Sequence, residues 1–533
     1  MIGFRSSLTV NSLLQSSVMS SLTLDRPRSP VVRPGTRVPH AIVIGSGFGG
    51  LAAAVRLGAR GYRVTVLEKL DQPGGRAYVF RQDGFTFDAG PTIVTLPQMF
   101  EELWSLAGRK FSDDITLKPI DPFYRLRFDD GETFTACRDP EAMRREVGRL
   151  SPGDVDGYER FMAQCKPIFE VGFEQLSSQP FNSVLSMAKL LPELFRLKSY
   201  RTVHGLAASY MKDPRLRIAL SFHPLFIGGN PFTTTSIYCL ISHLEREYGV
   251  WFAMGGTGAL VKGLVSLIEG QGGTIRYNEE VSAITVEGGA ATGVRLASGE
   301  TLSADIVVSN ADAAWTYKTL LPAEVRRRWT DKKLARARYS MSLFVWYFGT
   351  KRQYRGVPHH TILLGPRYKE LLRDIFDRKV LAPDFSLYLH HPTATDPSLA
   401  PPGCDTFYVL SPVPNLASGV DWAHAAEPYR RAVSDFLSRT VLPGLEENVV
   451  TSRIVTPQDF HTRLRSVLGA AFGFEPVFTQ SAWFRPHNRS EEVDRLFLVG
   501  AGTHPGAGLP GVLSSARVLD SVVPHGADLA GNP

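Results

Sequence analysis

The chain has 533 residues, of which 43% are hydrophobic and 21% charged, and its net charge is +7. This length allows about two to four domains and a large buried core, and so diffuse an excess of basic residues does not indicate a nucleic-acid partner. No window reaches the roughly 18 apolar residues that a membrane-spanning helix needs, so any membrane contact is expected to be peripheral. The four cysteines lie far apart, which favours a reducing, cytoplasmic setting over a disulfide framework.

Residues 1–39 are rich in Ser, Arg and Pro and contain no acidic residue before Asp25. They lack the continuous apolar core of a signal peptide, although their composition also fits an organellar transit peptide. We predict a disordered N-terminal tail over 1–39, with Met19 as an alternative initiator.

Residues 40–69 begin the folded part with a β-α-β unit. An apolar strand is followed at once by Gly45, Gly47 and Gly50 in a G-x-G-x-x-G pattern, and a helix-like stretch comes next. These glycines allow a tight turn, a close approach of the backbone to a pyrophosphate, and close packing of helix on strand. Glu68 lies 18 residues beyond Gly50, where a carboxylate can accept a hydrogen bond from a ribose hydroxyl. The unit predicts a dinucleotide site.

The loop after this unit distinguishes FAD from NAD. Gly75 and Arg76 supply backbone donors and one fixed cation that can bind the pyrophosphate a second time, which an NAD domain does not need. Another glycine loop, "FLVGAGTHPGAGLPGV", precedes a helix predicted to begin near Val512. A helix N-terminus directed at the flavin would stabilise the negative charge that reduction places there. We therefore predict FAD, and no second G-x-G-x-x-G unit is available for NAD(P) as electron acceptor.

From about 140 to 250 the pattern turns helical. Apolar residues in 181–201 recur at spacings of three and four residues among Lys and Arg side chains, with Pro192 as a predicted kink: Val184, Met187, Leu191, Leu194 and Phe195. A basic amphipathic stretch of this kind favours docking on an anionic membrane surface. A core-facing helix with solvated basic residues explains the same pattern, and both interpretations remain open.

Nucleotide-domain character returns at 255–312. A glycine-rich turn is followed there by strands, a Gly-Gly hairpin and a Ser-Gly hairpin, and the last strand ends at Ser309. Residues 340–480 alternate strand-like runs with helices, as an antiparallel sheet with helical cover does. The Asp-Gly hairpin in "FYRLRFDDGETF" is assigned to the first nucleotide segment.

The expected fold class is α/β, with a Rossmann-like FAD-binding domain assembled from discontinuous segments, an inserted α+β substrate domain and a helical membrane-proximal region. The predicted divisions are an N-terminal tail at 1–39, the FAD-binding domain at 40–130, 255–325 and 481–525, a helical substrate and membrane-proximal region at 131–254, the substrate-domain sheet at 326–480, and a C-terminal tail at 526–533.

Several longer motifs are more specific than the glycine loops. They include "GFTFDAGPT", "GGTGALVKGL", "TQSAWFRPHNR" and "LVGAGTHPGAGLPGV". Through them, and over nearly all of 40–517, the chain resembles the bacterial-type phytoene desaturases, which are FAD-containing carotene desaturases of the amine-oxidase-like flavoprotein superfamily. One departure is Ala253-Met254, where many relatives have Pro-Arg, and it puts in doubt both a role for that cation and the identity of the product.

The resemblance implies an enzyme that docks on the membrane, takes an acyclic C40 polyene from the lipid and introduces double bonds by hydride transfer to flavin N5. Phytoene would be converted toward neurosporene or lycopene, with a quinone or oxygen as electron acceptor, and a homo-oligomer is left open. Carried over residue by residue, the FAD contacts would be Gly45, Gly47, Gly50, Glu68, Gly75, Arg76, Gly90, Pro91, Thr92, Val281, Gly502, Gly511 and Val512.

Catalytic groups are harder to assign from the residues. The resemblance places Arg485, His487 and His504 near the flavin, where a catalytic or flavin-tuning role competes with ordinary structural hydrogen bonding. Glu245 and Glu247 are expected on a solvated or salt-bridged helix face rather than as a general base.

The pairs His359-His360 and His390-His391 suggest metal ligands by their residue type. Neighbours on a strand point to opposite faces, however, so one metal cannot easily use both members of a pair. We predict no metal site.

Three alternatives to a phytoene desaturase remain. The nearest is another carotenoid-modifying flavoenzyme, such as a hydroxycarotenoid or C30 diapophytoene desaturase, a carotene isomerase or a ketolase. An amine oxidase often carries a cysteinyl-flavin bond, and no cysteine lies in the C-terminal flavin motif. The non-enzymatic alternative is a lipid-binding protein that flavin stabilises.

Overall fold

The structure is a computed structural model that describes residues 37–181 and 184–529. The predicted tail over 1–39 lies almost entirely outside the described residues. At the other end, Gly526–Leu529 form the short helix α19 in place of the start of the predicted tail 526–533.

A five-stranded parallel sheet carries the glycine loops. Its strand order is β19-β13-β1-β2-β9, and each neighbouring pair is parallel. Three distant parts of the chain supply the strands, which are β1 (His40–Ile44), β2 (Arg63–Leu67), β9 (Thr274–Arg276), β13 (Ile306–Ser309) and β19 (Leu496–Leu498). The sheet is therefore assembled from discontinuous segments, as the sequence predicted.

Alternate residues of β1 bury against different layers. Ala41 and Val43 pack toward three helices, whereas Ile42 and Ile44 pack toward a three-stranded antiparallel sheet. The helices are α2 (Phe48–Ala59), α11 (Thr257–Gly270) and α18 (Leu509–Val522), and the small sheet comprises β10 (Val281–Glu287), β11 (Ala290–Leu296) and β12 (Thr301–Ser303). Because both faces are covered, β1 is apolar at successive positions instead of alternating with polar residues.

A second, seven-stranded sheet has the order β18-β14-β17-β16-β15-β6-β7. Its strands are β6 (Tyr124–Arg127), β7 (Thr133–Ala136), β14 (Ser342–Thr350), β15 (His360–Leu363), β16 (Leu387–His390), β17 (Asp405–Val413) and β18 (Val449–Val455). The predicted Asp-Gly hairpin is present as β6 and β7, but β6 pairs in parallel with β15. These strands therefore lie in the second sheet instead of with the first nucleotide segment 40–130, because their apolar side chains bury in its core.

The seven-stranded sheet has a covered face and a face toward the interior cavity. Phe344 and Trp346 of β14 pack with Val433 and Leu437 of helix α15 (Trp422–Thr440) on the covered face. Leu343, the residue before Phe344, points to the other side and lines the cavity.

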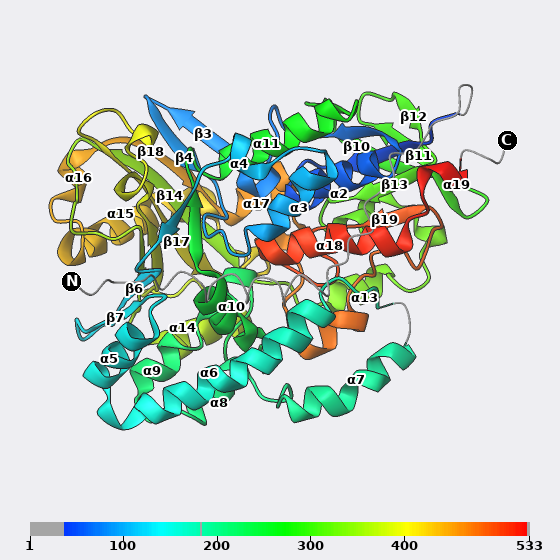
Figure 1. The fold of residues 1–533 in the computed structure, drawn as a ribbon. Helices are drawn as coiled ribbons and strands as arrows, with labels where there is room; N and C mark the ends of the chain where they lie inside the picture. The colour runs from blue at the N-terminus through cyan, green and yellow to red at the C-terminus, as the bar shows by residue number, and fades with distance from the viewer. Residues whose placement is uncertain (1–36, 182–183, 530–533) are drawn as a thin grey trace, which may run out of the picture.

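The helical region borders both sheets. Figure 1 shows α5, α6, α8 and α9 along the lower edge of the view and α7 below α18. Its helices are α5 (Pro140–Leu150), α6 (Val155–Phe169), α7 (Val184–Arg196), α8 (Val203–Ala208), α9 (Pro214–Ala219) and α10 (Leu240–Tyr248). Helix α7 continues through Pro192, the residue at which we expected a kink.

Smaller elements join these layers. The two-stranded pairs β3-β4 and β5-β8 are antiparallel. The bounds are β3 (Val79–Gln82), β4 (Phe85–Asp88), β5 (Leu117–Ile120), β8 (Val250–Ala253), α3 (Gln98–Leu106), α4 (Phe111–Asp114), α12 (Ala313–Trp315), α13 (Asp331–Arg336), α14 (Tyr368–Arg373), α16 (Leu445–Asn448) and α17 (Pro457–Leu464). None of the described helices combines the length and the apolar character that crossing a membrane requires.

Candidate functional site

One cavity of about 570 Å³ extends from the glycine loops of the parallel sheet into the apolar space between the seven-stranded sheet and the helical region. All the predicted FAD contacts except Gly50 line this cavity. Gly50 packs behind the first loop, where an added Cβ would lie 2.0 Å from the carbonyl oxygen of Gly45. The tertiary structure thus brings together residues that are hundreds of positions apart in the sequence.

The first glycine loop is held between β1, β2 and the loop after β2. The Gly45 N–H donates to the Leu67 carbonyl at 2.8 Å, with Gly45 at a φ of +89°, and the Gly74 N–H donates to the Ser46 carbonyl at 3.0 Å. Helix α2 then begins at Phe48 with no side-chain cap. Its first backbone N–H groups are therefore free to bind an anion in the cavity.

Glu68 hydrogen-bonds to the first glycine loop, a structural role that the sequence did not reveal. Its carboxylate accepts hydrogen bonds from the Ser46 N–H at 2.9 Å, the Ser46 hydroxyl at 2.6 Å and the Leu70 N–H at 2.8 Å. These bonds lock the glycine loop to the end of β2 and hold a buried carboxylate at the cavity wall. Contact between this carboxylate and a ribose hydroxyl stays a prediction.

Arg76 is a partly buried cation that forms no salt bridge with a carboxylate among the described residues. Its Nε donates to the Ala471 carbonyl at 2.6 Å and its Nη2 to the Ser466 hydroxyl at 3.0 Å. Burial lowers the pKa of this guanidinium, and the charge of Asp312 opposes the shift. A partly buried cation without a salt-bridged partner at the cavity wall fits an anionic ligand, because a pyrophosphate would compensate its charge at close range.

The C-terminal glycine loop supplies a second helix N-terminus. Helix α18 begins at Leu509, three residues before the predicted start at Val512, and Gly508 caps it without a side-chain hydrogen bond. An added Cβ at Gly502 would lie 2.7 Å from that of Ala313, so this loop and the residues after β13 pack too closely for a larger side chain. The loop and the start of α18 line the cavity, and the predicted contact of this helix N-terminus with the flavin stays a prediction.

The three candidate catalytic residues occupy different places. His504 lines the cavity, with Nε2 2.9 Å from the Leu176 carbonyl and with Nδ1 buried and unpartnered. Arg485 is fully buried outside the cavity lining and donates to the Phe474 and Ala501 carbonyls. His487 also lies outside the lining, and its Nε2 is 3.0 Å from the Trp483 carbonyl. Of the three, only His504 is placed to contact a ligand in this cavity.

The half of the cavity that lies away from the glycine loops is lined mainly by apolar side chains. Helix α7 contributes Met187, Leu190 and Leu194, and other walls come from α10 and the strands of the seven-stranded sheet. The hydroxyls of Tyr388 and Tyr408 both lie within hydrogen-bond distance of Thr92, at 3.1 and 2.8 Å. Desolvation raises the pKa of both phenols, so they are neutral donors at physiological pH. This half suits a hydrocarbon chain.

Glu245 corrects an expectation. We expected it on a solvated or salt-bridged face of the "LEREYG" helix, but only 5% of its side chain is exposed, and it lines the cavity from α10. Its Oε2 accepts a hydrogen bond from the Tyr124 hydroxyl at 3.0 Å and lies 3.3 Å from His223 Nε2. Glu247, in contrast, is exposed as expected. The helical repeat alone could not show which of the two acids faces inward.

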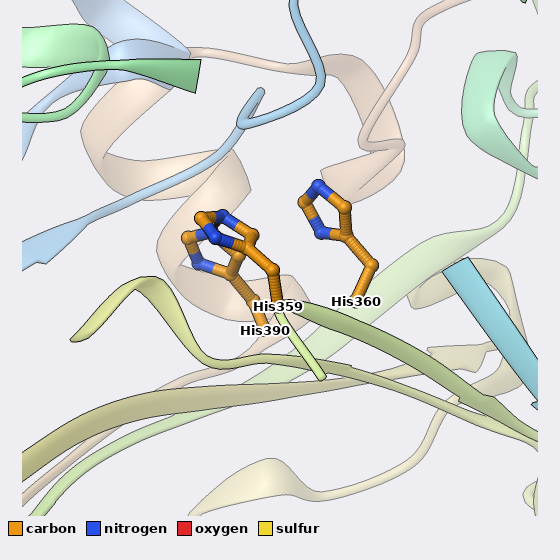
Figure 2. A group of neighbouring side chains, drawn as sticks. All are labelled: His359, His360 and His390. Carbon is orange, nitrogen blue, oxygen red and sulfur yellow. Dashed lines mark hydrogen bonds between the residues drawn. The ribbon is translucent and has the colours of Figure 1, made fainter. Parts of the chain in front are cut away.

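Three histidines gather beside the cavity. Figure 2 shows the rings of His359 and His390 together and that of His360 next to them, and one nitrogen of each lies within 4.8 Å of the others. The expectation that His359 and His360 point to opposite faces is wrong, because His359 precedes β15 and its ring centroid is 4.4 Å from that of His360.

Four of the six ring nitrogens of this group have protein partners, whereas His360 Nε2 and His390 Nδ1 are buried without one. His359 Nε2 lies 3.1 Å from His390 Nε2, and His360 Nδ1 lies 2.7 Å from the Tyr388 hydroxyl. Burial lowers the pKa of all three rings, to about 3 for His360. A divalent cation here would be buried with no carboxylate ligand within the group, so the absence of a metal stays our prediction.

Comparison with known proteins shows what this arrangement is similar to. The family model of flavin-containing amine oxidoreductases matches residues 48–518. A neurosporene-forming phytoene desaturase from Cereibacter sphaeroides is 54% identical over 93% of this chain and 96% of its own. A lycopene-forming phytoene desaturase from Pseudescherichia vulneris is 49% identical over 90% of this chain and 98% of its own. Among solved structures, an oxidoreductase from Methanosarcina mazei shares the fold with a TM-score of 0.60 at 18% identity, covering 90% of this chain and 100% of the other.

Proposed function

The chain belongs to the bacterial-type phytoene desaturases within the flavin-containing amine oxidoreductases, and on this basis we propose that it introduces double bonds into phytoene, an acyclic C40 carotene, toward neurosporene or lycopene. It is an FAD-dependent oxidoreductase that acts on CH-CH bonds. The observation that carries the choice of substrate is a cavity that joins the glycine loops to an apolar half.

A hydrocarbon offers no group for hydrogen bonding, so binding must come from shape and apolar burial. That burial contributes about 0.8 kcal/mol for each CH₂ group removed from water. The apolar wall formed by α7, α10 and the seven-stranded sheet provides such burial, and the polar groups of the cavity concentrate near the glycine loops. We infer that the polyene lies in the apolar half with one C–H bond at the flavin end.

FAD, when bound, supplies the hydride acceptor of the reaction. The N-terminus of α2 and the Arg76 guanidinium would hold its pyrophosphate, and Glu68 would accept a ribose hydroxyl. The N-terminus of α18 would face the flavin ring, where it would stabilise the charge of the reduced form.

We also propose that the substrate arrives from a membrane past helix α7. The inner side of this helix lines the cavity through Met187, Leu190 and Leu194. Its outer side exposes Leu191 by 51% and Phe195 by 72%. Both interpretations of the 181–201 stretch thus find support, since one face of α7 faces the interior and the other is apolar and open. The segments 131–254 and 326–480 would together form the inserted substrate domain, on a peripheral membrane protein at the cytoplasmic side.

The test is to incubate the purified protein and FAD with phytoene in liposomes and to follow both the polyene spectrum and the flavin absorbance without oxygen. We expect a red-shifted polyene and bleached flavin in proportion, and recovery of the flavin when a quinone or oxygen is added. A change of double-bond geometry without flavin reduction would instead indicate an isomerase. Retention of phytoene with no bleaching would indicate a lipid-binding protein.

A further inference from the structure

Glu245 is an acid in the apolar half of the cavity. It lies on α10 beside Leu240, Ile241 and Leu244, which all line the same wall because they share one face of the helix. A buried carboxylate costs free energy unless a partner compensates its charge. Its place among hydrocarbon-lined walls therefore requires a reason.

The protein compensates only one oxygen of this carboxylate. Oε2 accepts from the Tyr124 hydroxyl at 3.0 Å and lies 3.3 Å from His223 Nε2, while Tyr124 and His223 are themselves 2.9 Å apart. All three side chains are buried. Within the described residues no hydrogen bond engages Oε1. Two neighbours thus fix the orientation of the carboxylate and leave one oxygen available.

The other acids that line the cavity have different surroundings. Glu68 binds the glycine loop, Glu280 pairs with Arg465, and Asp312 caps the turn at Trp315. Glu279, the remaining one in the described part of the chain, is adjacent to Glu280 and pairs with Arg276. These four acids lie on the part of the cavity wall near the glycine loops. Glu245 is therefore the acid that a hydrocarbon in the apolar half would contact.

We propose that Glu245 is a catalytic residue of the desaturation, an inference that rests on the function proposed above. Removal of a hydride from a carbon of the polyene leaves a positive charge on that carbon. The Glu245 carboxylate stabilises this charge electrostatically, because an anion acts strongly across a cavity with few other polar groups. It then accepts the proton from the neighbouring carbon.

The step balances in atoms and electrons. One C–H bond breaks with its electron pair transferred as hydride to oxidised flavin, which is thereby reduced. The C–H bond on the adjacent carbon breaks next, its electron pair becomes the second bond of the new C=C, and the proton forms an O–H bond at Glu245 Oε1. The carboxyl returns its proton to water before the next turnover. Tyr124 and His223 are positioning residues, since they contact Oε2 and do not line the cavity.

The first test compares Glu245→Gln with Glu247→Gln. The glutamine keeps the shape of Glu245 and an oxygen that can accept from Tyr124, but it has neither the charge nor the basicity. We expect kcat for phytoene to fall about 100-fold, the low end of the range for general acid-base catalysis, with KM changed less than threefold. Glu245→Asp should recover part of the loss. Glu247→Gln, on the exposed side of the same helix, should match wild type.

The second test measures binding without turnover. The probe is a long prenyl chain with an internal tertiary amine, protonated at neutral pH, compared with its neutral hydrocarbon counterpart by quenching of tryptophan fluorescence. Wild type should bind the cation about 10-fold more tightly than the hydrocarbon, and Glu245→Gln should bind the two alike. Flavin content and melting temperature show whether each variant is folded.

The outcomes separate this inference from the proposed function. If wild type makes no red-shifted polyene, the proposed function fails, and the amine probe still tests the charge at Glu245. If wild type is active and folded Glu245→Gln keeps more than a third of its kcat, Glu245 is not catalytic. An unchanged preference for the amine in that variant would likewise overturn the electrostatic role.

Discussion

Arg76 is a partly buried cation at the cavity wall whose charge an anionic ligand can compensate. Its guanidinium contacts a carbonyl and a hydroxyl but no described carboxylate. Hydrogen bonds to charged groups contribute about 1.5–3 kcal/mol, so Arg76→Gln should weaken FAD binding roughly 10- to 100-fold. The ratio of flavin to protein after gel filtration, and FAD titration of the apoprotein, measure this. Arg81→Gln, at an exposed site on β3, is the control, and equal flavin affinity in both variants would contradict the assignment.

Buried histidines make stability depend on pH in a definite direction. Burial lowers the pKa of His504 to about 4, against 6.5 in an unfolded chain. Between these values the unfolded state binds more protons, so stability is fully present above pH 6.5 and is lost as the pH falls toward 4, by about 1.4 kcal/mol per pH unit for each such group.

Urea midpoints at pH 7.5 and 5.5 with saturating FAD test this expectation. The midpoint should fall at the lower pH, and it should fall less in His504→Gln, which cannot titrate. If the variant loses as much stability as wild type over this interval, His504 does not contribute to the pH dependence.

Residue-level prediction from sequence is most specific where a motif fixes the backbone. Gly45, Gly47, Gly75 and Gly502 line one cavity, because a glycine in such a loop marks close approach of the backbone, and their contact with FAD stays a prediction. The buried position of Glu245 was missed, because its neighbours Tyr124 and His223 come from distant segments. The sequence around "LEREYG" gives no indication that Tyr124 and His223 lie next to Glu245.

At the scale of elements, α7 has two apolar sides with different surroundings. Complete burial of a Leu or Phe side chain contributes about 1.5–3 kcal/mol. Replacing the half-exposed Leu191 and the exposed Phe195 together by Ser should therefore weaken binding to anionic vesicles about 100-fold or more, measured by flotation. Val450→Ser, at an exposed position on β18, is the matched control. Equal flotation of the double variant and wild type would place the membrane contact elsewhere.

Element boundaries were predicted well where a hydrogen-bonded turn ends them. The turns at Gly288-Gly289 and Ser298-Gly299 join β10, β11 and β12 as expected. The partner of the hairpin β6-β7 was not predicted, because pairing with β15 is a contact between segments more than 200 residues apart. The periodicity of a strand indicates that one of its faces is buried, but it does not indicate in which sheet the strand pairs.

At the scale of the whole molecule, the parallel sheet depends on segments from three parts of the chain. A fragment of residues 37–136 would contain β1 and β2 but neither β13 nor β19, and its hairpin β6-β7 would lack β15. One edge of β1 and the face that packs on β10–β12 would then be exposed to water, and its other face would keep α2 but lose α11 and α18. We expect this fragment to aggregate or remain unfolded, as judged by circular dichroism and size-exclusion chromatography beside the full chain. A soluble, cooperatively folded fragment would show that the first segment is an independent unit.

The sequence by itself determined the dinucleotide loop, the FAD assignment and the family, because these depend on short motifs in which each glycine or charge has a local backbone role. The tertiary structure alone decided that these loops share one cavity with an apolar half, that α7 faces it on one side, and that Glu245 rather than Glu247 enters it. The physical reason is that burial and charge compensation depend on which distant segments pack together. A sequence pattern indicates that a side chain is to be buried, but it does not indicate which residues it packs against.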